Sequence, residues 1–214
     1  MPSRVTQKAL RLAATATFLP STRRYNLTLS EGHKFIWFRV AKVGTRTIFS
    51  RLADDGVTLD LESPYDIHYS PKLYSDYFKF AFVRNPWDRL VSCWKNKVID
   101  QNYFAFDETQ HAEMKNFPKF VDWVAKQKID SNDIHLRSQA ALIDLENCDY
   151  LGRMENFEED LGKVFSAIGL PNKSRKVSNR TSERKTYQDY YDDDLMNKVG
   201  KIYNKDIQIF GYRF

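Results

Sequence analysis

The chain has 214 residues, 42% of them hydrophobic, with a net charge of +5 and a pI of about 9.0. This length and composition suit a single domain with a sizeable core, and eight glycines and seven prolines exclude a fibrous or low-complexity protein. The positive charge is typical of proteins that bind anions, but it does not distinguish a nucleotide from a nucleic acid, a polyanionic glycan or a membrane surface.

The first thirty residues contain basic side chains and no acidic ones. They faintly resemble an organellar transit peptide, but a basic arm or surface helix is the simpler interpretation. No stretch of the chain approaches the roughly 20 apolar residues of a transmembrane helix. We therefore expect a basic arm or helix at residues 1–30, a single domain at residues 31–214, and a soluble cytoplasmic protein without a signal peptide.

Two segments have the pattern of a strand, a turn and a helix. Residues 34–40 form an aromatic and β-branched run, which predicts a buried strand, and an apolar pattern with helical spacing begins at Ile48. Residues 77–83 predict a second strand. Asn85 then fits the N-cap of a helix and Pro86 its first position.

The second half of the chain continues the alternation. Residues 101–116 have no clean period and predict a surface excursion, whereas residues 117–124 predict a helix. A short strand at residues 148–152 precedes a helix that begins at Asn156, with Glu159 as its capping-box partner. The remaining predicted elements are a basic loop at residues 172–187 and a last helix that opens at residues 192–194.

Strands that alternate with helices predict an α/β fold, here a three-layer sandwich with a mostly parallel central sheet. Ligands of such sheets bind at the carboxyl ends of the strands. We therefore expect the turns that follow the first two predicted strands to lie at the same rim of the sheet.

The turn after the first strand, residues 42–47, has the composition of an anion site. Gly44 lets the backbone approach a phosphate closely, and the amides at the start of the following helix favour an anion. Lys42 and Arg46 add charge. The pattern G-x-x-x-x-G-K-[ST] is absent, so this is not the phosphate loop of a nucleoside triphosphatase.

The turn after the second strand carries Arg84, and Ser92 follows two turns into the helix. A guanidinium binds phosphate through two parallel hydrogen bonds, and the hydroxyl can add a third. Two separated phosphate sites fit a 3',5'-bisphosphorylated adenosine, whereas the linear triphosphate of ATP does not fit them.

These segments resemble a known family. KVGTRT (residues 42–47) and FVRNPWDRLVSCWKNK (residues 82–97) resemble the 5'-phosphosulfate loop and the 3'-phosphate motif of sulfotransferases that use 3'-phosphoadenosine 5'-phosphosulfate (PAPS). Two later stretches also resemble this family: YLGRMENFEEDL and YYDDDLMNKVGKIYNKDIQIFGYRF. The likeness covers roughly residues 34–214, is closest to the carbohydrate sulfotransferases, and implies their P-loop-like fold.

The resemblance also implies roles for the matching residues. Lys42 would stabilise the charge of the departing phosphate, and Arg84 and Ser92 would hold the 3'-phosphate. Arg46 departs from the family pattern, where a small residue is common. The donor-binding residues implied in this way are Lys42, Val43, Gly44, Thr45, Arg46, Thr47, Arg84, Ser92, Arg184 and Lys185.

The reaction implied is an in-line displacement at sulfur that releases adenosine 3',5'-bisphosphate (PAP) and requires no metal. The acceptor hydroxyl, expected on a carbohydrate, needs a general base. Several carbohydrate sulfotransferases place this base in the region of His68, which we take as the first candidate and as catalytic together with Lys42. His135 is the reserve candidate and, with Gln139, an expected acceptor contact. Asp66 is a further candidate for the general base.

Two other functions remain open at this point. A nucleotide kinase or NTPase with an atypical phosphate loop would need a magnesium-binding acid after a strand and a Walker lysine, and neither is apparent. A non-enzymatic binder of a polyanion fits the basic charge. It does not explain why basic and hydroxyl residues follow the strand ends, and we expect no nucleic-acid partner.

Overall fold

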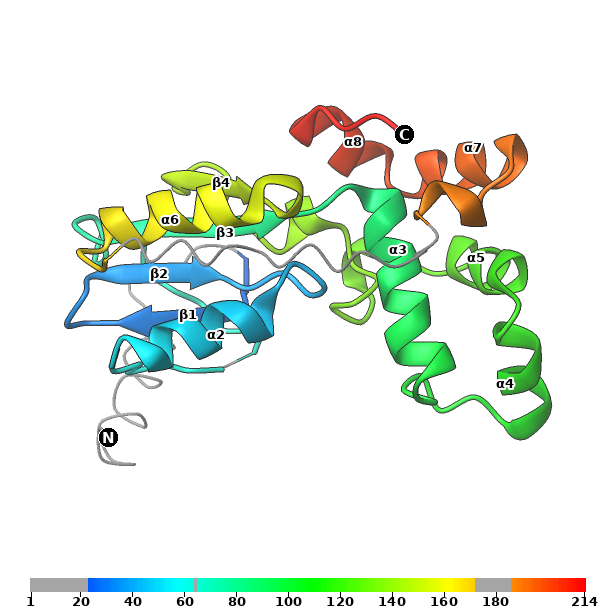
Figure 1. Cartoon of the computed structure of the whole chain (residues 1–214), viewed down its shortest axis with the longest axis horizontal. Coiled ribbons are helices and arrows are strands. Elements are labelled where there is room, and N and C mark those ends of the chain that lie inside the picture. The colour runs from blue at the N-terminus through cyan, green and yellow to red at the C-terminus, as the bar shows by residue number, and fades with distance from the viewer. Residues whose placement is uncertain (1–22, 64, 172–185) are drawn as a thin grey trace. The chain divides into compact units, whose positions relative to one another are not determined.

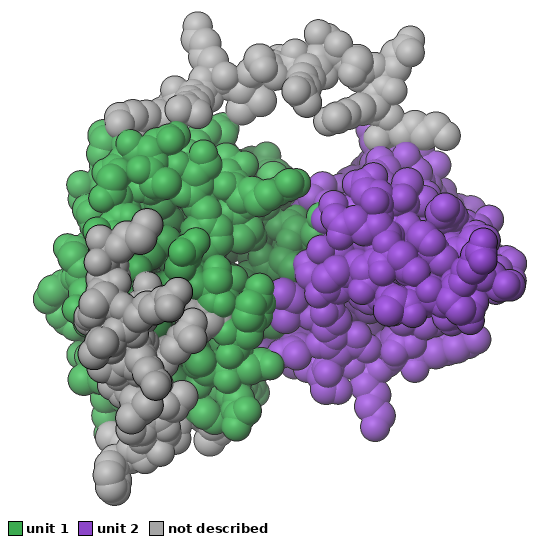
Figure 2. Space-filling model, turned by 90° about the horizontal axis from the view of Figure 1, so that it is seen from below, with its two compact units in different colours: residues 1–83, 142–177 green, residues 84–141, 178–214 purple. Residues whose placement is uncertain are grey.

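The computed structural model describes residues 23–63, 65–171 and 186–214. The chain forms two compact units (Figure 2): residues 1–83 with 142–177, and residues 84–141 with 178–214. The single domain expected for residues 31–214 stays a prediction.

Unit 1 contains a four-stranded sheet, labelled in Figure 1. Its strands lie in the order β1 (Leu27–Ser30), β2 (Phe35–Phe38), β3 (Phe78–Val83) and β4 (Tyr150–Arg153). β1 is antiparallel to β2, whereas β2, β3 and β4 are parallel. The expected α/β fold with a mostly parallel sheet is therefore confirmed. The described residues of this unit form helices α2 (Thr45–Asp54) and α6 (Phe157–Ala167) and the 3-10 turn Met154–Asn156.

The edge strand β1 falls within residues 1–30, which the sequence assigned to a basic arm. All four of its residues are buried, and β1 pairs with β2 along its length. The arm prediction is therefore wrong for residues 27–30, because burial of this short strand outweighs the basic character of the chain before it. Residues 1–22 lie outside the described residues.

Helices α2 and α6 cover the same face of the sheet. The ring of Phe49 in α2 lies 5.1 Å from that of Trp37, and the ring of Phe157 in α6 lies 5.4 Å from that of Phe82. Trp37 and Phe82 point to one face because Trp37 pairs with Phe80, two residues before Phe82.

Irregular chain covers the opposite face. Tyr69 packs edge-to-face against Phe38 with ring centroids 5.5 Å apart. Leu61 forms an antiparallel bridge with Leu29 and so lies beside the edge strand β1. The sheet therefore has helices on one face, while the segment around Tyr69 contributes to the layer on the other.

The described part of unit 2 is helical. The core packs around Trp87, Phe120, Val199 and Tyr203. Helix α4 was not expected, because Met114 is its one buried residue and a single apolar position produces no period. The helices are α3 (Pro86–Trp94), a π-helix (Lys95–Ile99), α4 (Glu108–Met114), α5 (Phe117–Ala125), α7 (Asp193–Ile202), α8 (Asn204–Phe210) and three 3-10 turns (Ile129–Ser131, Gln139–Ala141, Gln188–Tyr190).

The predicted helix caps have mixed outcomes. Asn85 caps α3 as predicted, since its side chain accepts a hydrogen bond from the amide of Trp87 and Pro86 follows at the first position. The capping box at Asn156 is wrong, because this side chain makes no cap hydrogen bond. The acidic residues of the first turn of α6, which include Glu159, still complement the helix dipole.

Candidate functional site

The turn between β2 and α2 depends on Gly44. This residue is the N-cap of α2 with φ 80°, a left-handed conformation that favours glycine. Its carbonyl accepts hydrogen bonds from the amides of Thr47 and Ile48 at 2.9 and 3.1 Å. A Cβ at this position would lie 2.7 Å from the ring of Phe157. Glycine is therefore required for both conformation and space.

Positively charged residues flank Gly44 at the start of α2. Lys42 has φ 71°, a conformation that non-glycine residues rarely adopt and that clusters at functional sites. Arg46 is exposed, and no acidic residue lies in the first turn of α2. The N-terminus of a helix attracts anions through its amides and its dipole. The turn therefore has the chemistry of an anion site.

The two predicted hydroxyl donors differ in their surroundings. Thr45 donates its hydroxyl hydrogen to the carbonyl of Val40 at 3.2 Å, whereas Thr47 is exposed at the helix surface. Val43 is fully buried, so its predicted contribution to the cradle is restricted to the backbone.

His68 lies at the edge of the sheet where β2 ends. β1 is antiparallel, so its first residue, Leu27, lies opposite Phe38, the last residue of β2. Just beyond that end, Tyr25 pairs with Ile67, the neighbour of His68. The topology of unit 1 therefore brings His68 and the Gly44 turn to the same edge, and the role of His68 as a base stays a prediction.

The ring of His68 is already engaged. Its Nε2 atom accepts a hydrogen bond from Nε of Arg24 at 3.0 Å. This nitrogen therefore carries no proton in the structure, and its lone pair is occupied. Asp66, the other predicted base in this region, has φ 48° and donates its amide to Oδ1 of Asn26 at 3.0 Å.

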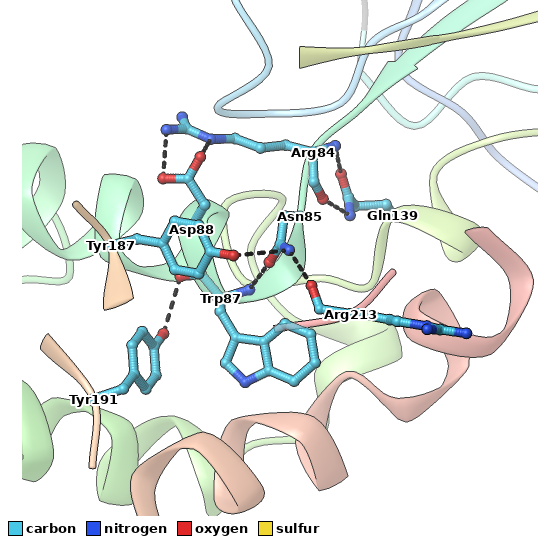
Figure 3. A network of polar contacts seen from close by, with 8 residues as sticks. All are labelled: Arg84, Asn85, Trp87, Asp88, Gln139, Tyr187, Tyr191 and Arg213. Atoms are coloured by element: carbon cyan, nitrogen blue, oxygen red, sulfur yellow. Dashed lines mark hydrogen bonds and ion pairs between the residues drawn. The ribbon is translucent and has the colours of Figure 1, made fainter. Parts of the chain in front are cut away.

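Arg84 follows the last residue of β3, which runs parallel to β2 and ends at the same edge of the sheet. Its guanidinium donates to both carboxylate oxygens of Asp88, at 2.7 and 2.8 Å (Figure 3). Asp88 and Ser92 are four residues apart in α3 and share a helix face. Unit 2 therefore places Arg84, Asp88 and Ser92 along one stripe.

Gln139 has a different role from the one predicted. It is fully buried, its Oε1 accepts from the amide of Arg84 at 2.9 Å, and its Nε2 donates to the carbonyl of Arg84 at 2.8 Å (Figure 3). Because both ends of its amide bind the main chain of Arg84, the expectation of an acceptor contact at Gln139 is wrong. Gln139 positions Arg84 instead.

Asp206 of α8 supports this arrangement and was missed in the sequence. Its buried carboxylate accepts hydrogen bonds from the amides of Gln139 and Ala140, at 2.8 and 2.9 Å. Burial raises the pKa of Asp206, while the two amides work in the opposite direction. An acid in the middle of an apolar helical pattern was the one available signal.

Asn85 ties the C-terminal part of the chain to the Arg84 turn. Its Nδ2 donates to the carbonyl of Arg213 at 2.8 Å and to the hydroxyl of Tyr187 at 3.3 Å (Figure 3). Tyr187 comes two residues after Lys185 in the chain. The predicted donor contacts Arg184 and Lys185 themselves lie outside the described residues.

His135 belongs to a second polar cluster in unit 2. Its Nδ1 lies 2.7 Å from Oδ1 of Asp133, and the hydroxyl of Tyr103 donates to Oδ2 of the same carboxylate at 3.0 Å. Although burial opposes it, hydrogen bonds from His135 and Tyr103 lower the pKa of Asp133 to about 2. Burial lowers the pKa of His135 itself, and Asp133 works in the opposite direction.

Metal-ligand clusters and membrane-spanning helices are both absent from the part of the chain that the structure describes. There, no group of three or more His, Cys, Asp or Glu residues is placed to hold a metal ion. None of the helices in the same residues is long and apolar enough to cross a membrane.

The fold and the Gly44 turn define an α/β protein whose second strand is joined by a glycine turn to the N-terminus of a helix, an arrangement suited to anions. The chain belongs to the sulfotransferase family, because the sequence model of that family matches residues 25–213. An uncharacterised protein of Archaeoglobus fulgidus is 33% identical over 106 residues, which cover 47% of this chain and 74% of that protein. No solved structure matches the chain significantly. The predicted family is confirmed, while its carbohydrate branch stays a prediction.

Proposed function

We propose that this sulfotransferase transfers a sulfuryl group from PAPS to a hydroxyl, most favourably one on a carbohydrate, and releases PAP. The observation that carries this proposal is the pairing of β2 with β3. These parallel neighbours are followed by the Gly44 turn and by Arg84, the two anion-binding features that the family resemblance assigns to opposite ends of the donor.

The Gly44 turn supplies what a 5'-phosphosulfate needs. The first amides of α2 point away from the helix body, and Lys42, two residues before the N-cap Gly44, carries a full positive charge. Charge develops on the bridging oxygen as the sulfur–oxygen bond breaks, and a fixed cation at that point lowers the barrier. Lys42 can provide this stabilisation without a metal ion, as the sequence also predicted.

Arg84 and Ser92 supply what a 3'-phosphate needs. Asp88 orients the Arg84 guanidinium through Nε and Nη2, and a guanidinium is the side chain that binds a phosphate through parallel hydrogen bonds. Ser92 is partly exposed on the same helix face and can donate its hydroxyl hydrogen. Arg184 and Lys185 would add charge from the basic loop, as the resemblance implies.

The acceptor hydroxyl requires a base, and the sequence ranks the imidazole of His68 ahead of that of His135. A carbohydrate acceptor rests on the likeness to the carbohydrate branch. Lipids and small alcohols offer the same nucleophile and belong in the same screen.

Thermal shift measurements separate the proposal from its alternatives. PAP should raise the melting temperature more than ATP with Mg²⁺ at equal concentration, because binding to the native state stabilises it according to the affinity. A larger shift with ATP and Mg²⁺ would favour a kinase or NTPase. A shift with heparin alone would favour a non-enzymatic polyanion binder.

Activity is tested with PAPS that carries a radioactive sulfur atom. The protein is incubated with a panel of glycans and small alcohols, and labelled products are separated from PAPS and free sulfate. We expect transfer to at least one hydroxyl. Binding of PAP without transfer to any acceptor or to water would remove the enzymatic part of the proposal.

A further inference from the structure

Unit 2 contains a pocket of about 540 Å³ that is separate from the Arg84 site. Its walls come from the 3-10 turn Ile129–Ser131, from Ser138, and from residues 201–205, where α7 ends and α8 begins. All of these residues belong to unit 2, so the pocket is defined within that unit alone. A cavity of this size accommodates a small-molecule ligand.

The lining of this pocket is positively charged. Lys128, Lys201 and Lys205 line it together with one acidic residue, Asp130. The Asp130 carboxylate already has a counter-charge, because its Oδ2 lies 3.4 Å from Nζ of Lys205. Among the residues that the structure describes, no carboxylate forms an ion pair with Lys128 or Lys201. Two positive charges are therefore in excess, and they favour an anionic ligand.

Neutral polar groups accompany these charges. Ser138 is 2% exposed, and its hydroxyl donates to Oδ1 of Asp130. An ionised carboxylate has about four lone-pair sites, so Asp130 can accept further hydrogen bonds from a ligand. Ser131 and Asn204 add a hydroxyl and a side-chain amide to the lining. Such groups match a ligand that carries several hydroxyl groups.

The composition of the lining does not suit a nucleotide. Among the described residues that line the pocket there is neither an aromatic ring nor an arginine. Bases commonly stack on aromatic rings, and a guanidinium is the side chain best matched to a phosphate. Ile129 and Ile202 instead offer apolar side chains that can pack against the carbon atoms of a sugar ring.

The backbone of the pocket is fixed by the hydrogen bonds that also hold the Arg84 turn. Ser138 directly precedes Gln139, whose side-chain amide binds both main-chain groups of Arg84. Lys205 directly precedes Asp206, whose buried carboxylate accepts from the amide of Gln139 at 2.8 Å. The walls are therefore ordered before a ligand arrives, which lowers the entropic cost of binding.

We propose that this pocket binds a carboxylated or sulfated saccharide, and that Lys128 and Lys201 contact its anionic groups. Asp130 and Asn204 bind its hydroxyl groups. The site is additional to the proposed donor site and involves no covalent step. It is also independent of the proposed function, because its ligand is defined by the lining of the pocket alone.

Titration calorimetry with a sulfated uronic-acid disaccharide derived from heparin tests the assignment. The wild-type chain should bind it more tightly than cellobiose, which has no charge, or inorganic sulfate, which has no sugar. Combining Lys128→Gln with Lys201→Gln should weaken binding about tenfold, because two charge-assisted contacts are lost. The matched control combines Lys115→Gln with Lys126→Gln, at exposed lysines of unit 2 that do not line the pocket. It should change the affinity by less than about twofold.

The results that would overturn the assignment are distinct from those that bear on sulfuryl transfer. Absence of disaccharide binding, equal binding of cellobiose or sulfate, or an equal loss in the control variant would each remove it. Displacement of the disaccharide by PAP would mean that it occupies the donor site, and would also remove it. A chain that binds the disaccharide but transfers no sulfuryl group from PAPS would contradict the proposed function alone.

Lysine acetylation followed by mass spectrometry replaces the variants should the double substitution not fold. The disaccharide should slow the acetylation of Lys128 and Lys201 in the wild-type chain and leave that of Lys115 and Lys126 unchanged. Equal protection of all four lysines, or protection of none, would contradict a saccharide site in this pocket.

Discussion

The turns after β2 and β3 are held by different kinds of interaction. At the first, backbone conformation dominates: Gly44 and Lys42 both have positive φ, and the carbonyl of Gly44 starts the next helix within four residues. At the second, Arg84 is held by side chains far away in the sequence. Gln139, 55 residues later, binds both its main-chain groups, and Asp206 binds the amide of Gln139 in turn.

This difference predicts how each turn responds to mutation. A turn that depends on local conformation should be sensitive to the residue that adopts it and tolerant of changes elsewhere. A turn that depends on distant contacts should lose its shape when any member of the network is removed, even one that never touches a ligand.

Loss of the binding side chains themselves should have the largest effect. Arg84→Ala removes charge-assisted hydrogen bonds to the 3'-phosphate, and we expect PAP to bind about 100-fold more weakly. Arg213→Ala is the matched control. It also removes one positive charge, but its guanidinium points away from the network in Figure 3, and only its carbonyl binds Asn85. Titration calorimetry with PAP measures both, and an equal loss in the control would contradict a specific site.

Lys42 allows binding and stability to be separated. Lys42→Ala and Lys42→Gly should both lose most affinity for PAP, since either removes the charge. Lys42→Gly should also raise the free energy of unfolding by about 1 kcal/mol, because glycine adopts φ 71° without strain. Urea unfolding checks this second effect. A Lys42→Gly protein less stable than Lys42→Ala would argue against strain at the turn.

Among substitutions in the turn after β2 that do not change its net charge, Gly44→Ala should lower the stability of the protein most. The added methyl group meets both a positive φ and the ring of Phe157 at 2.7 Å, and we expect a loss of about 2–4 kcal/mol in unfolding free energy. Gly56→Ala is the control, because Gly56 has φ 71° with open space around it and should lose only about 1 kcal/mol. Equal losses would mean that contact with Phe157 is unimportant.

The same contrast explains which parts of the site the sequence could predict. The Gly44 turn, the strand before it and the Asn85 cap depend on residues within a few positions of one another. The local sequence pattern was therefore enough to predict them. The role of Gln139 was predicted wrongly, because its partner is 55 residues away and an amide has no preference between a ligand and a main chain. Asp206 was missed for the same reason, because the amides that it binds, those of Gln139 and Ala140, lie 67 and 66 residues earlier in the chain.

Gln139→Ala tests the long-range turn. The substitution leaves the amide and carbonyl of Arg84 without their buried partner, and we expect a loss of about 2 kcal/mol in unfolding free energy. PAP should bind several-fold more weakly although Gln139 does not contact it. Gln188→Ala, at an exposed glutamine, should change neither quantity. Unchanged PAP affinity in Gln139→Ala would show that Arg84 keeps its position without the network.

The smallest effect is expected at an ion pair that joins the last turn of α2 to α6, away from the Gly44 turn. Arg51 donates to Glu158 at 2.7 Å, and their side chains are 14% and 26% exposed. Glu158→Gln should lower the unfolding free energy by at most about 1 kcal/mol and should leave PAP affinity nearly unchanged, because Gly44 fixes the turn locally. Glu159→Gln removes the partner of Lys163 in a largely exposed pair and should have no measurable effect. A large loss of PAP affinity in Glu158→Gln would mean that the first turn, like the second, depends on distant contacts.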